Sequence, residues 1–289
     1  MPMTVLEVIQ RSTEFLTKKE VDSPRLQVEL MLAHVLKMKR MALYLNFEKP
    51  LGSKELDEVR EMVRRRGGRE PLQHILGSTC FCGLEFEVNP KVLIPRPETE
   101  LLAELGWQFL NSLPSSPTPP VALDYGTGSG CLAVTVAAKS PTAQLHALDI
   151  SPDALATAQK NAATHQMGSR IQFHLGDGFA AVPPGLQFNL IISNPPYIAS
   201  DEIATLQPEV RDHDPRLALD GGRDGLDFYR RLAKEAAPRL LPNGKIMLEF
   251  GEGQAEAIQK LFEDEKWVVE GVKADYSGRL RILIARQTG

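Results

Sequence analysis

The sequence contains little cysteine, with three in 289 residues, and this scarcity excludes a framework of disulfides. Cys80 and Cys82 are separated by one residue, which is the wrong spacing for a thioredoxin-type redox pair or a zinc ribbon. The six histidines show no paired metal-ligand spacing either. A Ser-His-Asp order and a Gly-x-Ser-x-Gly elbow are also missing, which argues against a hydrolase. We therefore expect no bound metal and a reducing, cytoplasmic environment.

Long apolar runs are missing too. No stretch approaches the roughly 18 apolar residues that a membrane-spanning helix needs, and Glu7, Arg11 and Glu14 interrupt any signal-peptide core. Positive charge is not in excess, because 33 Lys and Arg face 37 Asp and Glu, giving a formal net charge of −4. Such a balance offers no overall attraction to a polyanion. We expect a soluble cytoplasmic monomer with no membrane partner and no direct nucleic-acid substrate.

The N-terminal region has a helical pattern without strands. Thr4 and Glu7 have the spacing of a capping box, and apolar residues then recur with the period of an α-helix. Ser23 followed by Pro24 predicts a second helix, and a third is expected from residue 53 through the arginines at 64–66. We interpret those arginines as favourable charges at a helix C-terminus rather than as a nucleic-acid site. The pattern predicts a helical domain at 1–75 and a β-hairpin linker at 76–95.

The remaining residues, 96–289, alternate between strand and helix patterns. Such alternation predicts an α/β fold, with a doubly wound, mostly parallel sheet covered by helices on both faces. The expected strands number seven, at 121–124, 145–149, 171–175, 189–193, 245–250, 267–273 and 280–285. The expected helices lie at 97–113, 130–139, 151–164, 226–240 and 254–262.

A glycine-rich loop follows the first of these strands. Its residues are Asp124, Tyr125, Gly126, Thr127, Gly128, Ser129 and Gly130. Glycines at this position let a ligand approach the backbone, and the helix that follows offers free N–H groups. The spacing is neither the Gly-x-Gly-x-x-Gly of nicotinamide enzymes nor a P-loop. It resembles motif I of the S-adenosylmethionine-dependent methyltransferases.

Acidic residues follow the next two strands. Asp149 ends one of them, where its carboxylate could accept hydrogen bonds from both hydroxyls of a ribose. Asp177 follows the other, at the position where such methyltransferases use an acidic residue for the adenine amino group. A turn-forming role between Gly176 and Gly178 is an equally good interpretation of Asp177 taken alone.

The most informative motif is Asn194-Pro195-Pro196-Tyr197, directly after an apolar strand. Two prolines alone would only end a strand. Here they have fixed φ and no N–H, so they can hold the Asn194 side-chain oxygen and the Pro195 carbonyl as two acceptors facing one point. Such a pair suits an NH₂ group bonded to an sp² carbon. Enzymes that methylate adenine N6 and enzymes that methylate glutamine amides share this motif.

Further segments separate these two classes. They are Pro71 to Gly77, Phe81-Cys82-Gly83, Ile94 to Glu100, Pro208 to Arg216, and Gly225 to Tyr229. Together they resemble the release factor glutamine methyltransferase family, also called PrmC or HemK. The resemblance runs from the helical region to the last strand, and the Ile94 to Glu100 motif is its most specific part.

The resemblance implies a class I, Rossmann-like methyltransferase domain at 96–289. It also implies S-adenosylmethionine as cofactor and class 1 peptide-chain release factors as partners. The product would be N5-methylglutamine in their Gly-Gly-Gln loop, and residues 1–75 would dock the substrate. The implied catalytic residues are Asn194 and Pro195, and the implied substrate-binding residues are Asn194, Pro195, Pro196 and Tyr197. The implied cofactor-binding residues are Gly126, Thr127, Gly128, Ser129, Gly130, Asp149, Ile150, Asp177, Gly178, Phe179 and Asn194.

Two departures from the family pattern and two alternative functions stay open. His74 stands where tyrosine is common, and Gly178 stands where many members have a bulky side chain. The second departure leaves either Ile150 or Phe179 to cover the adenine. Arg96, Pro97 and Thr99 are expected in the wall of the cofactor pocket, and residues 199–225 are expected to bind or cover the substrate. The alternatives are an adenine-N6 methyltransferase and a non-catalytic, cofactor-binding scaffold for translation factors.

Overall fold

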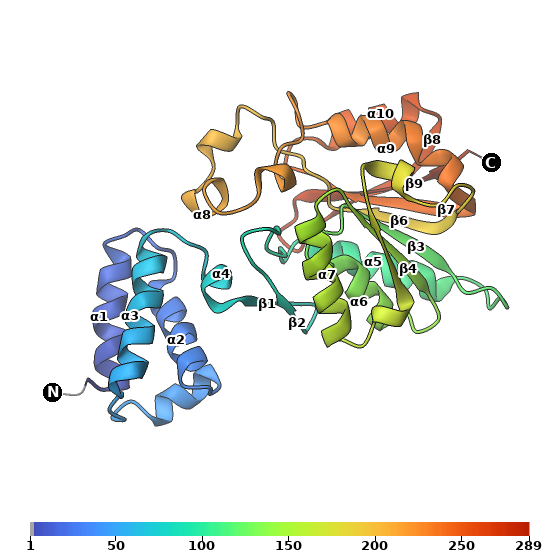
Figure 1. Cartoon of the computed structure of the whole chain (residues 1–289). Coiled ribbons are helices and arrows are strands. Elements are labelled where there is room, and N and C mark those ends of the chain that lie inside the picture. The colour runs from blue at the N-terminus through green and yellow to red at the C-terminus, as the bar shows by residue number, and fades with distance from the viewer. Residues whose placement is uncertain (1–2, 289) are drawn as a thin grey trace. The chain divides into compact units, whose positions relative to one another are not determined.

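The computed structural model describes residues 3–288 (Figure 1). Contacts divide the chain into two compact units. One unit contains residues 3–78 together with Gln207–His213. The other contains Thr79–Leu206 and residues 214–288. The first unit therefore includes a short segment from the middle of the region that was expected to form the second domain.

The first unit is built from helices. They are α1 (Val5–Thr17), α2 (Pro24–Val35), the 3-10 helix η1 (Arg40–Leu45), α3 (Ser53–Gly67), α4 (Leu72–Leu76) and α8 (Pro208–Arg211). The predicted capping box begins α1, since Thr4 Oγ1 accepts from the Glu7 N–H at 3.3 Å and Glu7 Oε2 accepts from the Thr4 N–H at 2.8 Å. Val5, Val28 and Leu43 are among the fully buried residues of this unit's core.

The arginines at the end of α3 pair with carboxylates. Arg66 is 5% exposed and donates to Glu209 of α8 at 2.7 Å, and Arg69 donates to both oxygens of the same carboxylate at 2.7 Å each. Arg65 pairs with Glu70 at 2.5 Å. Arg66 and Arg69 thus hold α8 within the first unit through a shared, half-buried carboxylate.

The second unit contains the expected mostly parallel sheet of seven strands, in the order β5-β4-β3-β6-β7-β9-β8. The strands are β3 (Val121–Tyr125), β4 (Gln144–Asp149), β5 (Ile171–Leu175), β6 (Phe188–Ser193), β7 (Leu240–Glu249), β8 (Trp267–Ala274) and β9 (Leu280–Gln287). The pairs from β5 to β7 are parallel, whereas β9 is antiparallel to both of its neighbours. The predicted α/β fold is confirmed.

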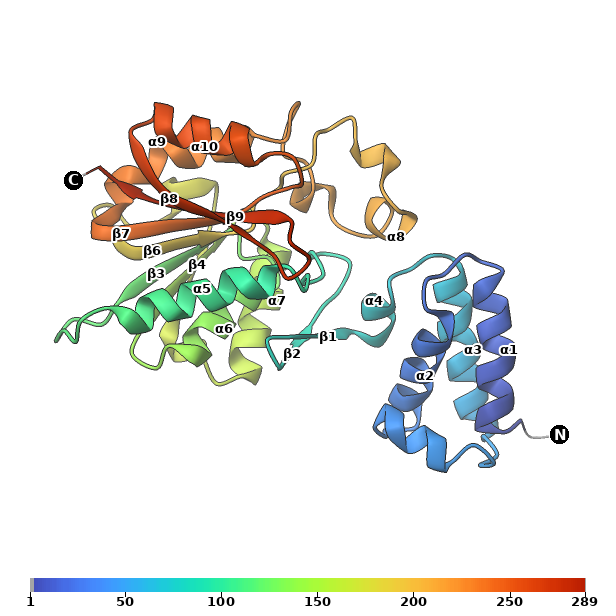
Figure 2. The ribbon, with the colours of Figure 1, turned by 180° about the vertical axis from the view of Figure 1, so that it is seen from behind.

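Helices cover both faces of this sheet, as Figures 1 and 2 show. One face carries α5 (Thr99–Ser112), α6 (Cys131–Lys139) and α7 (Pro152–Thr164), and the other carries α9 (Asp227–Glu235) and α10 (Ala255–Asp264). Each face has its own apolar core, with Leu102 and Val134 buried on the first and Tyr229 and Phe262 on the second. The sheet is therefore buried on both sides, which explains its long apolar strands.

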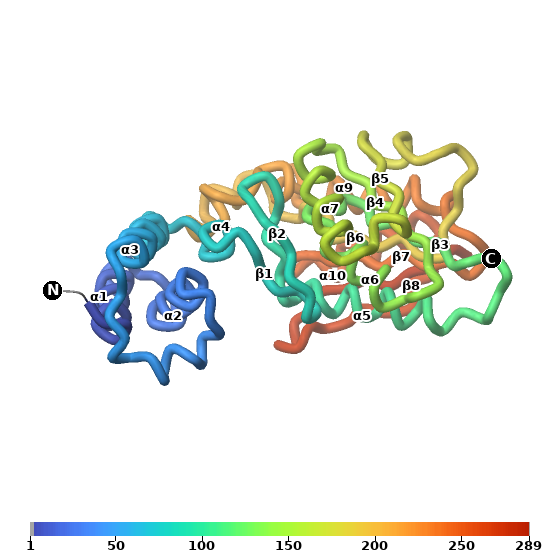
Figure 3. The backbone as a smooth tube through the Cα atoms, turned by 60° about the horizontal axis from the view of Figure 1, so that its bottom comes forward, coloured from blue at the N-terminus to red at the C-terminus, as the bar shows by residue number. Residues whose placement is uncertain are grey.

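The predicted hairpin is present as β1 (Ser78–Phe81) and β2 (Leu84–Glu87). Figure 3 shows β2 beside α7. The contact is polar as well as apolar, because the Glu87 N–H donates to Asn161 Oδ1 at 2.8 Å and His165 Nε2 lies 2.7 Å from the Glu85 carbonyl oxygen. This anchoring positions the chain that follows β2, which passes Lys91 and Val92 on its way to α5.

One predicted helix is too long. The pattern over 226–240 predicted a continuous helix, but α9 ends at Glu235 and a 3-10 turn, η6 (Ala237–Arg239), follows. Pro238 lies in that turn and has no N–H to continue the helical hydrogen bonds. Strand β7 starts directly afterwards at Leu240, five residues before the predicted start of that strand at Lys245.

Candidate functional site

The candidate site lies where four neighbouring strands end. In the order of the sheet, Asp177 lies after β5, Asp149 is the last residue of β4, the glycine loop follows β3, and Asn194 follows β6. Parallel strands lie about 4.8 Å apart, so these groups form one row along a single edge of the sheet. From β3 the chain continues to β4 and β5 on one side of β3, whereas the later strands β6 and β7 are added on its other side. This reversal is the place where open α/β sheets bind ligands.

The glycine loop is held open by its own hydrogen bonds. Buried Asp124 accepts from Thr127 Oγ1 at 2.6 Å and from the Ala133 N–H at 3.1 Å. Gly126 and Gly128 have φ of +76° and +55°, values that favour glycine. Among the described residues, nothing lies within 4 Å of a Cβ added at either glycine. The backbone at both positions therefore borders open space.

Thr127, Ser129 and Gly130 support this loop from behind. Thr127 and Ser129 are buried, and the Ser129 carbonyl accepts from Asn161 Nδ2 at 2.9 Å. Gly130 begins α6 with φ +81°, and a Cβ there would lie 2.9 Å from the Ala158 Cβ, so only glycine fits against α7. These three residues therefore shape the loop and do not line the pocket.

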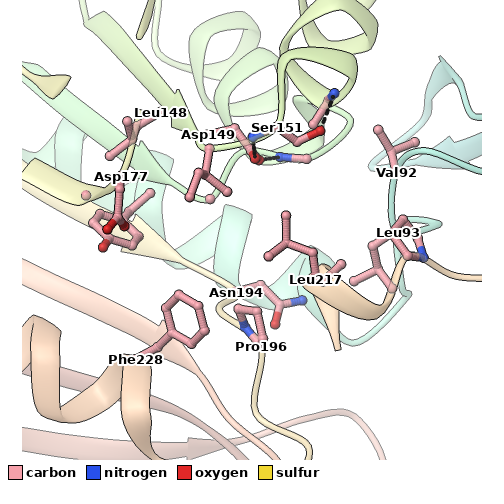
Figure 4. Close-up of a pocket in the computed structure, with 18 of the residues that line it drawn as sticks. Val92, Leu93, Leu148, Asp149, Ser151, Asp177, Asn194, Pro196, Leu217 and Phe228 are labelled. Atoms are coloured by element: carbon pink, nitrogen blue, oxygen red, sulfur yellow. Dashed lines mark hydrogen bonds between the residues drawn. The ribbon is translucent and has the colours of Figure 1, made fainter. Parts of the chain in front are cut away.

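The Asp149 carboxylate is fixed by backbone donors on both sides. Its Oδ2 accepts from the Gly128 N–H and its Oδ1 from the Ser151 N–H, each at 2.9 Å, and Figure 4 shows the carboxylate at the pocket. Burial raises the pKa of Asp149, while the hydrogen bonds from Ser151 and Gly128 lower it. Each oxygen keeps a second lone pair, so the group can accept further hydrogen bonds in a set orientation.

The Asn194 amide is oriented by residues behind it. Its Nδ2 donates to Thr99 Oγ1 at 3.1 Å, and the Thr99 hydroxyl is in turn hydrogen-bonded to Glu249. Thr99 and Glu249 are each 2% exposed. Because Nδ2 is bound on the buried side, Oδ1 remains as the acceptor that Asn194 offers to the pocket (Figure 4).

The rest of the proline motif is anchored by its backbone. The Tyr197 carbonyl accepts from Gln254 Nε2 at 2.9 Å, and Gln254 Oε1 accepts from the Gly251 N–H at 2.9 Å. Burial raises the pKa of Tyr197 to about 12. Pro195 is buried, whereas Pro196 lines the pocket. The motif is thus held by its backbone, and Asn194 and Pro196 are its two residues that line the pocket.

A pocket of about 220 Å³ joins these groups. The predicted residues that line it are Gly126, Gly128, Asp149, Ile150, Asp177, Gly178, Asn194 and Pro196. Thr127, Ser129, Gly130, Phe179, Pro195 and Tyr197 do not line it, and neither do Arg96, Pro97 and Thr99. Arg96 instead donates to Asp214 at 2.5 Å. Of the two candidates for covering an adenine, Ile150 lines the pocket, while Phe179 is buried against Tyr125 with ring centroids 5.3 Å apart.

Sequence reasoning missed several residues that line the pocket. They include Val92, Leu93, Tyr125, Leu148, Leu217, Phe228 and Arg231. Leu217 belongs to the stretch 199–225, so at least part of that stretch borders the pocket. Phe228 lies within a segment that carried the family resemblance, and that signal could have marked it. Nothing in the local pattern singles out Arg231, which reaches the pocket from α9.

Within residues 3–288, no helix is long and apolar enough to cross a membrane. The same described residues contain no group of three or more His, Cys, Asp or Glu side chains that could hold a metal ion.

Comparisons with known proteins agree with this geometry. Residues 7–77 match the model of the PrmC N-terminal domain, and residues 106–223 match the methyltransferase small domain. The chain is 46% identical over 260 residues to a release factor glutamine methyltransferase of Geobacter sulfurreducens, covering 90% of this chain and 88% of that protein. It is 39% identical to the protein of the same name from Cereibacter sphaeroides, covering 98% and 99% of the two chains.

A solved structure supports the fold alone. It is the T. thermophilus 16S rRNA N2 G1207 methyltransferase in complex with AdoMet and guanosine. The TM-score is 0.52 at 19% identity, and the match covers 73% of this chain and 50% of that one.

Proposed function

This chain belongs to the release factor glutamine methyltransferase family, and from that premise we propose that it methylates N5 of a glutamine side chain in class 1 peptide-chain release factors. The glutamine would be that of the Gly-Gly-Gln loop. The observation that carries the proposal is the Asn194 amide, whose Nδ2 is bound by Thr99 so that Oδ1 is offered to the pocket as an acceptor.

The cofactor is S-adenosylmethionine, which supplies an electrophilic methyl group when bound. The pocket fits it in two respects. The backbone at Gly126 and Gly128 borders open space that any side chain would fill. The Asp149 carboxylate is held by two backbone N–H groups and keeps lone pairs for a ribose. We propose Gly126, Gly128, Asp149, Ile150, Asp177, Gly178 and Asn194 as direct contacts, with Thr127, Ser129, Gly130 and Phe179 shaping the site.

We further propose that Asn194 and Pro195 are the catalytic residues. An amide nitrogen is a poor nucleophile, because its lone pair is delocalised into the carbonyl group. Asn194 Oδ1 and the Pro195 carbonyl would each accept one N–H of the glutamine amide, so that the nitrogen lone pair points toward the methyl group. Positioning of this kind can supply roughly 7 to 11 kcal/mol. Pro196 and Tyr197 would pack against the glutamine side chain.

The domain roles belong to the same proposal. Residues 1–75 would dock the release factor, 76–95 would link the domains, and 96–289 would carry out the transfer. We also propose that the protein acts as a monomer. We propose a cytoplasmic enzyme, because its proposed substrate is a translation factor. The net charge of −4 supports a protein rather than a nucleic-acid substrate.

A direct test offers the full-length protein a purified release factor and an adenine-containing DNA duplex side by side, with S-adenosylmethionine. We expect a mass increase of one methyl group on the Gly-Gly-Gln peptide and no methylated adenine. An Asn194→Ala variant serves as the control for contaminating activity. Methylated adenine without methylated glutamine would favour the adenine-N6 alternative, and no methylation of either would favour the scaffold.

A further inference from the structure

The end of the pocket at β5 contains an ion pair that the sequence did not reveal. Arg231 of α9 donates through Nη1 to Asp177 Oδ1 and through Nη2 to the Asp177 carbonyl oxygen at 3.3 Å. Its Nε lies 3.3 Å from the carboxylate oxygens of Glu235. Both Asp177 and Arg231 line the pocket, and their side chains are 66% and 30% exposed. The pair is therefore accessible to a ligand.

Gly178 makes room for the guanidinium of Arg231. A Cβ added at Gly178 would lie 2.7 Å from Arg231 Cζ, closer still to Nη2, and 3.0 Å from the Tyr125 hydroxyl oxygen. Any larger residue at 178 would have to displace the Arg231 side chain. The guanidinium of Arg231 thus occupies the space that a bulky side chain at 178 would need.

The order of the strands indicates which part of the cofactor reaches this pair. Asp177, Asp149, the glycine loop and Asn194 follow one another along the row of strand ends. A nucleoside has its ribose between the base and the methyl-bearing sulfur. If Asp149 holds the ribose and Asn194 faces the methyl group, the base extends to the opposite side, toward Asp177 and Arg231.

We propose that Arg231 joins Asp177 in recognising the adenine and supplies the hydrogen-bond donor to N1, with its guanidinium in the place of the missing side chain at 178. This inference rests on the proposed function for the orientation of the cofactor. Adenine presents a donor at N6 and an acceptor at N1. Arg231 uses Asp177 Oδ1, which leaves Oδ2 to accept from N6.

The guanidinium supplies the matching donor. Of the five N–H groups of Arg231, three have partners among the described residues, in Glu235 and in the side chain and backbone of Asp177. A remaining N–H can donate to adenine N1. Hypoxanthine presents the reverse pattern, with an acceptor at the 6-oxo group and a donor at N1. With Asp177 facing position 6 and Arg231 facing N1, the pair selects adenine over hypoxanthine.

Calorimetric binding of S-adenosylhomocysteine and of its hypoxanthine analogue, S-inosylhomocysteine, tests this proposal without any release factor. We expect Arg231→Ala and Arg231→Gln to bind the adenine compound about 10-fold more weakly and to lose most of the discrimination between the two bases. Arg230→Ala is the matched control. Arg230 lies on the same helix, pairs with Asp224 and Asp227 and does not line the pocket, so this variant should bind like the wild type.

Two results would overturn the proposal. One is unchanged affinity for the adenine compound in a folded Arg231→Gln variant. The other is an equal loss for both bases, which would make Arg231 a structural support of the pocket. These binding results do not depend on whether release factors are methylated, since binding of S-adenosylhomocysteine requires no methyl acceptor. The proposed methylation is tested separately, by the assay with a release factor.

Discussion

Replacing Thr99 by valine removes the group that orients Asn194 without touching the pocket itself. Thr99 Oγ1 accepts from Asn194 Nδ2 at 3.1 Å, and the side chain is 2% exposed at the start of α5. Valine has nearly the same shape but no hydroxyl. The Asn194 amide then loses its fixed partner, so Oδ1 is no longer held toward the pocket.

The expected loss follows from one neutral hydrogen bond. Such a bond contributes about 0.5 to 1.5 kcal/mol, which corresponds to a roughly 2-fold to 13-fold slower methyl transfer. Asn194→Ala deletes the acceptor itself and should lower kcat by about 100-fold to 1000-fold, like other deleted transition-state hydrogen bonds. The two variants should therefore rank clearly, with Thr99→Val intermediate between wild type and Asn194→Ala.

Single-turnover methylation of a purified release factor measures this loss, with the affinity for S-adenosylhomocysteine determined in parallel. Thr99→Ser keeps the hydroxyl and should recover most of the rate. Thr288→Val is a control elsewhere in the second unit, since the exposed Thr288 hydroxyl donates to the Lys266 carbonyl at 3.1 Å. Cofactor affinity should change little in the Thr99 variants and in the control, because neither residue lines the pocket.

Two outcomes would refute the reasoning. A folded Thr99→Val variant with the wild-type rate would show that Thr99 does not orient Asn194. A rate and a cofactor affinity that fall together, without recovery in Thr99→Ser, would show that Thr99 only supports the packing of α5.

Three further predictions concern single carboxylates. Asp149→Ala should weaken S-adenosylmethionine at least 10-fold, because charge-assisted hydrogen bonds contribute roughly 1.5 to 3 kcal/mol each, and unchanged affinity by calorimetry would contradict the ribose assignment. Burial raises the pKa of Glu249 to about 7, although the hydrogen bond from Thr99 opposes this rise. Protonated Glu249 stabilises the fold fully below its unfolded pKa, and this stabilisation is lost as pH rises through about 7. Between about pH 5 and pH 8, the Tm of Glu249→Gln should therefore fall less than the Tm of the wild type. Burial raises the pKa of Glu209, but hydrogen bonds from Arg69 and Arg66 lower it to about 2. Ionised Glu209 therefore stabilises the fold above its unfolded pKa, and this stabilisation is lost as pH falls toward about 2. In urea melts near pH 7, the free energy of unfolding of Glu209→Gln should be about 3 kcal/mol lower than that of the wild type, and the difference should shrink below about pH 4.

The sequence alone determined the features that depend on near neighbours along the chain. Capping boxes, apolar periodicity and glycine turns act over a few residues, and they predicted α1, the seven strands and the hairpin. Because the carboxyl ends of parallel strands share one edge, the same local reading predicted that Asp149, Asp177 and Asn194 approach one pocket. The predicted helix at 226–240 is too long, because the apolar periodicity continues past the point where Pro238 prevents further helical hydrogen bonds.

Only the tertiary structure decided which distant side chains meet. Asn194 and Thr99 are 95 residues apart, Asp177 and Arg231 are 54 apart, and Arg66 and Glu209 are 143 apart. Hydrogen bonds of this kind depend on how helices pack on the sheet and on the volume left between them, and no short-range pattern encodes that volume. Gly178 illustrates the limit. Its missing side chain was visible in the sequence, but the guanidinium of Arg231 beside it was visible only after folding.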